Sequence, residues 1–204
     1  MKTLFIHAKI NSEIDKSKIN SISNKLPKNI AIAYSIQYQE IAKEIKKILS
    51  KNHKITKFVQ VLGCSHPVFS KSTKAILLIS SGKFHAVSLA FETKLPVYVL
   101  ENNYLTQISK KEIEIFEQKQ KASYVKFLNS NKIGILISTK PGQQNLKKAM
   151  DLKKTIKNKN SYLFLCNNIN INEFENFEID SWINTACRRM DLNDNSIINM
   201  DKIK

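Results

Sequence analysis

Residues 75–100, AILLISSGKFHAVSLAFETKLPVYVL, contain the pattern that decides the fold. The runs AILLIS (75–80) and VYVL (97–100) are continuous and apolar, which is typical of strands buried on both faces of a parallel sheet. Between them, small polar residues lead into a helical pattern that we expect to begin near Phe84. Strand, helix and strand in this order predict a right-handed crossover in a layered α/β fold.

The same alternation continues along the rest of the chain. Further strand-like runs occupy residues 3–7, 29–35, 57–62, 133–138, 162–166 and 182–186. Amphipathic helical patterns occupy residues 37–52, 111–128 and 142–159. We therefore predict an α/β protein made of two consecutive three-layer units with mostly parallel sheets.

The long helical pattern places the domain boundaries. We expect residues 27–108 to form one α/β unit, residues 109–128 a connecting helix, and residues 129–204 a second α/β unit with a C-terminal tail. Residues 1–26 contain one strand-like run and one weak helix, too little for a domain, and they are interpreted as the remnant of a preceding domain. The lysine-rich tail after Met200 is expected to be solvated.

The chain is strongly basic: it contains 33 Lys and Arg residues and 17 Asp and Glu residues, and its formal net charge is +16. Almost all of it is dispersed lysine, in a chain equally rich in isoleucine and asparagine, which indicates an AT-rich genome rather than a binding site. Dispersed lysine supplies only the sequence-independent part of nucleic-acid binding, so an RNA-associated role stays open as an alternative. A hydrophobic content of 42% excludes a disordered protein.

No apolar stretch approaches the roughly 20 residues of a membrane helix, and the N-terminus becomes charged too soon for a signal peptide. We therefore expect no membrane association and a cytoplasmic location. Three cysteines are an odd number for a reducing compartment, which argues against a disulfide framework. No serine-elbow motif accompanies the four histidines, which argues against a hydrolase triad.

Two constellations follow strands of the first unit. In VLGCSHP (61–67), Cys64 comes directly after an apolar strand, at the edge where open α/β sheets gather ligands. The alternative is a buried structural cysteine. In the second constellation, Gly82 and His85 lie where a strand passes into a helix, and backbone N–H groups there can bind an anion. A serine N-cap explains the same small residues equally well.

Two more constellations follow strands of the second unit. ISTKPGQQNL (137–146) contains Lys140, which could neutralise a phosphate or carboxylate, but its single glycine matches no phosphate-binding or dinucleotide motif, and an ordinary turn is the alternative. NTACRRM (184–190) places Cys187 before the chain's only arginines, Arg188 and Arg189. Arginine gives a planar, bidentate grip on a carboxylate or a charge beside a thiolate; chance is the alternative.

The cysteines also favour one kind of metal chemistry. Cys64 and Cys187 are far apart in sequence, but both follow strands of α/β units and could converge at one cleft. No C-x-x-C pair is present, and thiolates meeting in this way suit an iron–sulfur cluster better than structural zinc. Cys166, within YLFLC, is interpreted as a core residue.

These motifs, in this order, resemble one family. IAIAYSIQY, QVLGC, ILLISSGKFH, ILISTKPGQ and NTACRRM are similar to segments of the diphthamide synthases, enzymes of the 2-(3-amino-3-carboxypropyl)histidine synthase type. The resemblance runs from about Thr3 to Asp194. It implies a radical transferase in which three related α/β domains each supply a cysteine to a four-iron four-sulfur cluster that holds S-adenosylmethionine. The 3-amino-3-carboxypropyl group then goes to a histidine of translation elongation factor 2, the first step of diphthamide biosynthesis.

The resemblance also implies roles for individual residues. By position, Cys64 corresponds to the metal ligand of the family's second domain and Cys187 to that of the third. The positions implied to line the cofactor cleft are Gly82, His85, Lys140, Gly142, Gln143 and Arg189. Of these, Lys140 and Arg189 are expected to hold the methionine carboxylate or a neighbouring charge.

The chain departs from the family pattern in three places. The family's first domain, with its cysteine, has no counterpart here, Arg188 replaces a usual proline, and Tyr38 stands where histidine is frequent. We favour a split enzyme in which a partner chain supplies the first domain and the third cysteine, as a homodimer or a heterodimer. A noncatalytic helper or scaffold subunit, a relic without iron, and a basic RNA-associated module are the alternatives.

Overall fold

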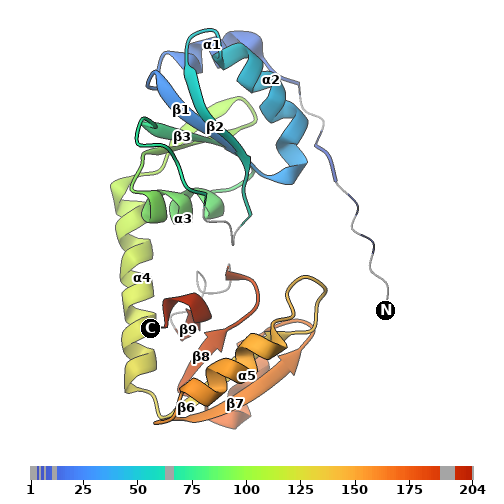
Figure 1. The fold of residues 1–204 in the computed structure, drawn as a ribbon, viewed down its shortest axis with the longest axis vertical. Helices are drawn as coiled ribbons and strands as arrows, with labels where there is room; N and C mark the ends of the chain where they lie inside the picture. The colour runs from blue at the N-terminus through green and yellow to red at the C-terminus, as the bar shows by residue number, and fades with distance from the viewer. Residues whose placement is uncertain are drawn as a thin grey trace. The chain divides into compact units, whose positions relative to one another are not determined.

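The computed structural model describes residues 4, 6, 8–10, 13–62, 67–188 and 196–203. The chain divides into two compact units, Met1–Glu114 and Ile115–Lys204. Each contains a mainly parallel sheet with helices packed on it (Figure 1). The α/β class predicted from the sequence is therefore confirmed. Within the described ranges, no helix is both long enough and apolar enough to cross a membrane.

The sheet of the first unit has the strand order β2-β1-β3-β4-β5. The first four strands in this order run parallel, and β5 pairs antiparallel with β4. The strands are β1 (Asn29–Tyr34), β2 (Lys54–Gln60), β3 (Ala75–Ile79), β4 (Val97–Glu101) and β5 (Tyr104–Gln107). β1 and β3 lie at the centre and are almost wholly apolar, because both of their faces are covered.

Helices cover both faces of this sheet. One face packs against α1 (Lys16–Ser23) and α2 (Gln39–Leu49), which follows the short 3-10 helix η1 (Ile36–Tyr38). The other face packs against α3 (Phe84–Thr93) and the beginning of α4 (Lys110–Asn129). The predicted three-layer arrangement is thus present in this unit. The apolar stripe of α2 at Ile41, Ile45 and Leu49 is buried, as its spacing indicates.

The first turn of α4 is fixed by a reciprocal cap. Ser109 Oγ accepts the N–H of Glu112 at 3.2 Å, and the Glu112 carboxylate accepts the N–H and the O–H of Ser109, each at 2.8 Å. The ammonium of Lys83 lies 2.8 Å from the second carboxylate oxygen. The hydrogen bond from Lys83, followed by those from Ser109, lowers the pKa of Glu112 from 4.5 to about 2.

We expect Glu112→Gln to lower the free energy of unfolding at neutral pH by about 1 kcal/mol, because solvent partly screens the lost ion pair. Since folding depresses the pKa of Glu112, its stabilisation is fully present above the unfolded value of 4.5 and is lost as the pH falls towards about 2. Urea midpoints of parent and variant should converge over this interval. Glu114→Gln, an exposed position on the same helix, is the control. A gap independent of pH would contradict the assignment.

The sheet of the second unit has the order β7-β6-β8-β9, and all of its pairs are parallel. Its strands are β6 (Lys132–Ser138), β7 (Asn160–Cys166), β8 (Ser181–Asn184) and β9 (Ile197–Asn199). One face packs against α5 (Leu146–Thr155) and the end of α4. The other face is covered by the 3-10 segment η2 (Ile171–Phe177) rather than by an α-helix.

Aromatic residues fill the face below η2. Phe164 of β7 lies 5.1 Å from Phe174 and 4.9 Å from Trp182, measured between ring centroids. Trp182 fits because its neighbour in the sheet is Gly134 of β6, where an added Cβ would overlap the indole atoms Cε3 and Cζ3. The missing side chain of Gly134 is therefore the space that the indole occupies.

The two sheets share one topology. In each, the first strand (β1 or β6) leads through a helix to an outer strand (β2 or β7), and the chain then returns to the opposite side of the first strand (β3 or β8). In open sheets, ligands gather outside the carboxyl ends of the strands, where the order reverses in this way. The reversal lies between β1 and β3 in one unit and between β6 and β8 in the other.

The structure corrects several details of the sequence interpretation. β2 begins three residues earlier than the apolar run, and β5 and β9 were not predicted. The tail after Met200 is not a solvated end: it forms the 3-10 turn η4 (Met200–Lys202), and Ile203 packs against the core of the second unit. The predicted strand at 3–7 lies largely outside the described residues.

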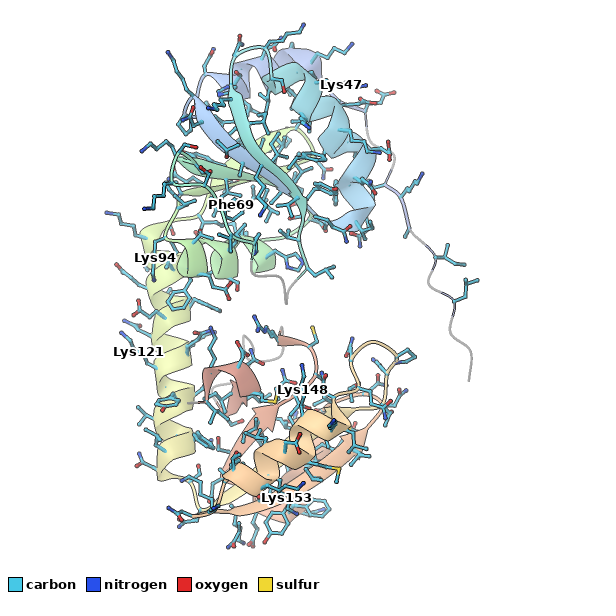
Figure 2. The ribbon with its side chains drawn as sticks, in the orientation of Figure 1. Lys47, Phe69, Lys94, Lys121, Lys148 and Lys153 are labelled. Atoms are coloured by element: carbon cyan, nitrogen blue, oxygen red, sulfur yellow. The ribbon has the colours of Figure 1, made fainter. Side chains whose placement is uncertain are left out.

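Lysine side chains project from many separate elements (Figure 2). The lysines labelled there come from α2, from the C-cap of α3, from α4 and from α5, namely Lys47, Lys94, Lys121, Lys148 and Lys153. This distribution matches the dispersed charge that the sequence indicates.

Candidate functional site at the carboxyl ends of the strands

In the second unit, the turn after β6 presents three of the predicted residues. Lys140 donates its N–H to Ser138 Oγ at 3.1 Å, and its carbonyl accepts the N–H of Gln143 at 3.0 Å. Gly142 has a φ of +78°, a left-handed conformation that favours glycine. Lys140 and Gln143 are half-buried and Gly142 is exposed. The turn is therefore internally hydrogen-bonded and open to a ligand.

The loop after β8 joins this turn. Thr185 Oγ1 donates to the carbonyl of Leu136 at 2.7 Å, and Asn145 Nδ2 donates to the carbonyl of Thr185 at 2.7 Å. Asn145 is the N-cap residue of α5, so the beginning of that helix is tied to the loop after β8. The structure thereby brings the 140–143 turn and Cys187 to the same edge of the sheet.

Two buried asparagines fix the backbone of Cys187. Asn184 Nδ2 donates to the carbonyl of Cys187 at 2.7 Å and to Asn199 Oδ1 at 2.6 Å. Asn184 Oδ1 accepts the N–H of Ala186 at 2.9 Å. Asn184 and Asn199 are only 2% and 3% exposed, so each lost bond would leave a buried polar group at a cost of about 1–3 kcal/mol. The Cys187 thiol thus stands on a rigid turn and is itself partly exposed.

Arg188 has a structural partner. Its guanidinium lies 3.1 Å from a carboxylate oxygen of Asp201 in η4, and Asn199 Nδ2 donates to the Arg188 carbonyl at 3.0 Å. Both ionic side chains are largely buried, at 24% and 30% exposure. Arg188 therefore anchors the C-terminal turn beside Cys187, a role that the interpretation of the tail as solvated had missed. Arg189 lies outside the described residues.

In the first unit, Gly82 lies on the loop after β3, and His85 lies in the first turn of α3. Gly82 has a φ of +73°, and its N–H donates to a Glu101 carboxylate oxygen at 3.3 Å. The N-cap of α3 is Lys83, with no side-chain cap bond, so the serine N-cap alternative is wrong. Ser80, only 1% exposed, has an Oγ with no hydrogen-bond partner among the described residues. The loop therefore combines an uncapped helix start with an unpaired buried hydroxyl.

Cys64 lies outside the described residues, so its position relative to Cys187 stays a prediction. Cys166 is not a core residue: it is half-buried at the end of β7, where burial, and secondly the negative charge of Glu173, raises the pKa of its thiol. Within the described ranges, no group of three or more His, Cys, Asp or Glu side chains could hold a metal ion.

Sequence reasoning missed the asparagines that build this edge. Asn184 and Asn199 end adjacent parallel strands and face each other in register, and Asn145 is the N-cap residue of α5. The available signal was an asparagine closing each of two short apolar runs, SWIN and IIN. The partner of each amide is distant in sequence, so the pattern alone did not reveal it.

The fold and this edge define a class: an open, doubly wound α/β protein with candidate ligand residues at the carboxyl ends of its strands. Residues 1–197 match the family described as diphthamide synthesis protein. The chain belongs to that family. The resemblance inferred from the five motifs is therefore confirmed.

Two archaeal relatives are named 2-(3-amino-3-carboxypropyl)histidine synthase. That of Pyrococcus horikoshii is 29% identical over 88% of this chain and 55% of its own length, and that of Methanocaldococcus jannaschii is 29% identical over 95% and 57%. Subunit 1 of the enzyme from Schizosaccharomyces pombe is 26% identical over 94% of this chain and 49% of its own. The chain thus spans about half the length of these curated relatives.

Solved structures agree with the sequence relatives. The crystal structure of Dph2 from Pyrococcus horikoshii matches 92% of this chain and 59% of its own, with a TM-score of 0.78 and 26% identity. A second crystal structure of that protein contains a 4Fe-4S cluster and matches with a TM-score of 0.77. The likeness extends over both units of the present chain.

Proposed function

We propose that this chain is a subunit of a radical S-adenosylmethionine enzyme that transfers a 3-amino-3-carboxypropyl group to a histidine of translation elongation factor 2. A partner chain supplies a further domain and the third thiolate. The observation that carries the proposal is Cys187, a partly exposed thiol held on a hydrogen-bonded turn at the carboxyl edge of the second sheet. A relative with the same fold has been crystallised with a 4Fe-4S cluster.

The residues at this edge fit one part of a cluster site. Three thiolates leave one iron of a four-iron cluster open, and Cys187 and Cys64 would be two of them. The rigid loop suits this role, because buried asparagines hold the Cys187 backbone and leave the sulfur free to act as a ligand. When bound, the cluster would supply the electron that cleaves S-adenosylmethionine.

The chain's other residues would bind and orient the small-molecule cofactor. The Lys140 ammonium would neutralise its carboxylate, and Gly142 would let the backbone approach it closely. In the first unit, Gly82 and His85 would line the cleft, and the unpaired Ser80 Oγ offers a buried hydrogen-bonding group. Arg189 would add a second positive charge. The protein would thus position the cofactor, whose own chemistry breaks the bond.

A basic RNA-associated module is the main alternative. It is supported by the net charge of +16, but Figure 2 shows labelled lysines on several different helices rather than on one element. Such a module would bind unrelated RNAs with similar affinity and a steep salt dependence. A salt titration with two unrelated RNAs, on the parent and on a variant lacking Cys64 and Cys187, therefore separates the two functions.

The direct test is anaerobic reconstitution with iron and sulfide in the presence of candidate partner chains. Transfer of label from carboxyl-labelled S-adenosylmethionine to elongation factor 2 should require this chain, the partner and a reductant. A substrate protein with its target histidine replaced by alanine is the control and should stay unlabelled. Full transfer by the partner chain alone would reduce this chain to a helper and contradict the proposal.

A further inference from the structure

One stretch of the chain departs from its basic composition. Residues 160–187 contain no lysine or arginine, although such residues make up 33 of the 204 in the chain. The same stretch contains all of the carboxylates of the η2 region, namely Glu173, Glu175, Glu178 and Asp180. It forms β7, η2 and β8. An acidic surface on a strongly basic protein is unexpected from composition alone.

The fold uses two of these four carboxylates. Glu178 pairs with the ammonium of Lys132 at 2.9 Å, and Asp180 accepts the N–H of the same lysine at 2.8 Å. Among the described residues, the Glu173 carboxylate accepts one long bond, from Asn170 at 3.3 Å, and both Glu173 and Glu175 are exposed. The charges of Glu173 and Glu175 therefore contribute little to the stability of the fold.

These charges lie beside an open sheet edge. β7 is the outer strand of its sheet, and its inward groups bond to the chain around β6: Asn160 donates to the Asn131 carbonyl, and Cys166 accepts the N–H of Thr139. In a parallel strand the backbone groups of successive residues point to opposite sides. The N–H and C=O groups that point outward are therefore those of Ser161, Leu163 and Leu165.

The other outer strands are protected from pairing. β2 carries Lys54 and Lys57, β5 has four residues and β9 has three. Lysine and short length are ordinary ways to prevent edge association. β7 has seven residues, without charge or proline, and exposes 47% of Tyr162 and 54% of Leu165. Within the described chain, this outer strand alone lacks both protections.

η2 places its acidic and aromatic side chains next to this edge. Phe177, 59% exposed, lies 5.1 Å from Phe164 of β7 between ring centroids. The charge of Glu173 also helps to raise the pKa of the Cys166 thiol at the end of the same strand. Phe177 and Glu173 are thus tied to β7, and Glu175 lies between them in the sequence of η2. We call the outward backbone of β7 together with Glu173, Glu175 and Phe177 the β7 edge surface.

We propose that the β7 edge surface binds an extended, lysine-rich segment of a partner protein, which adds to the sheet as a further strand. Backbone hydrogen bonds to β7 would give affinity, as in other strand additions. Lysines on the face toward η2 would pair with Glu173 and Glu175 and lie over the exposed ring of Phe177. This inference is independent of the proposed enzymatic function.

Charge decides between this occupant and the others. Two copies that paired β7 against β7 would bring their acidic surfaces together. Pairing of β7 with the lysine-bearing β2 of a second copy would be a head-to-tail contact, which gives an open chain of copies rather than a closed dimer. RNA would be repelled by the carboxylates. The net charge of +16 repels a basic peptide elsewhere on the protein, so binding of such a peptide requires a local acidic site.

The test uses a fluorescent peptide of alternating lysine and valine, as long as β7, and fluorescence anisotropy with the full chain. We expect Leu165→Pro, which removes an outward N–H without touching the pairing with β6, to weaken binding at least about tenfold. Leu165→Val keeps the N–H and should bind like the parent. Glu173→Gln with Glu175→Gln should weaken binding several-fold and flatten its salt dependence.

A peptide that is N-methylated at every residue tests the same backbone hydrogen bonds without changing the protein. It therefore keeps the proposal testable if the Leu165→Pro chain does not fold. It should not bind. Equal binding of the methylated and parent peptides, or of a glutamate–valine peptide, would overturn the proposal. Concentration-dependent dimerisation in sedimentation that Leu165→Pro abolishes would identify a second copy as the occupant and also overturn it.

Discussion

A Cys187→Ala variant, reconstituted anaerobically with the partner chain, is expected to retain at most about a tenth of the parent's iron, because cluster ligation requires the thiolate. The backbone at this position is held by Asn184 through the Cys187 carbonyl, not through the sulfur, so the fold should survive the substitution. Iron per chain and the absorbance of the cluster measure the loss, and the urea midpoint reports on the fold.

Cys166→Ala is the matched control for this experiment. Cys166 is also a partly buried thiol at the end of a strand of the same sheet, but it corresponds to no ligand position in the family pattern. It should therefore keep the parent's iron. Retention of iron by both variants would remove Cys187 from the site, and loss in both would point to a different set of thiolates.

The largest expected effect on stability comes from Gly134→Ala. In a strand, alanine for glycine normally gains about 0.5–1 kcal/mol through chain entropy. Here the new methyl group would overlap the ring of Trp182, a side chain that is only 5% exposed and packed against Phe164. Overpacking a core costs about 1–3 kcal/mol and occasionally more. The cost of the clash should therefore exceed the entropic gain, and we expect the unfolding free energy to fall by about 2–3 kcal/mol.

Two variants isolate the clash in urea unfolding. Gly142→Ala has open space for its Cβ but a positive φ, so it should cost about 1 kcal/mol by backbone strain alone. Combining Gly134→Ala with Trp182→Leu should cost clearly less than the sum of the single changes, because the smaller side chain makes room. Strict additivity would show that the indole is not the obstacle.

The central strands of both sheets were predictable because burial on two faces leaves a continuous apolar run, as in β3 and β6. β5 was not, since its residues YLTQ are mostly exposed and gain their order from antiparallel pairing with β4. β9 was missed for a similar reason: three apolar residues become a strand only beside β8. Short pairing partners are specified by tertiary contacts rather than by local pattern.

The residues of the candidate site likewise fall into two groups, those that the sequence indicated and those that only the structure reveals. The rule that ligands gather at the carboxyl ends of strands led from sequence to the 140–143 turn and to Cys187. It could not reveal Asn184, Asn199 or the ion pair between Arg188 and Asp201, because these contacts join residues from different strands and turns. Which groups react stays a prediction from the sequence, while the side chains that hold their backbone in place became visible only in the folded chain.

The repetition of one topology in both sheets has a consequence for how such a protein can evolve. Each copy encloses its own apolar clusters, and the boundary between the copies falls within α4 rather than across a sheet. A gene encoding such a protein can therefore be shortened, extended or divided in multiples of one module while every remaining piece keeps a complete interior. Evolution can rearrange a protein of this design by whole modules, without a new core being required each time.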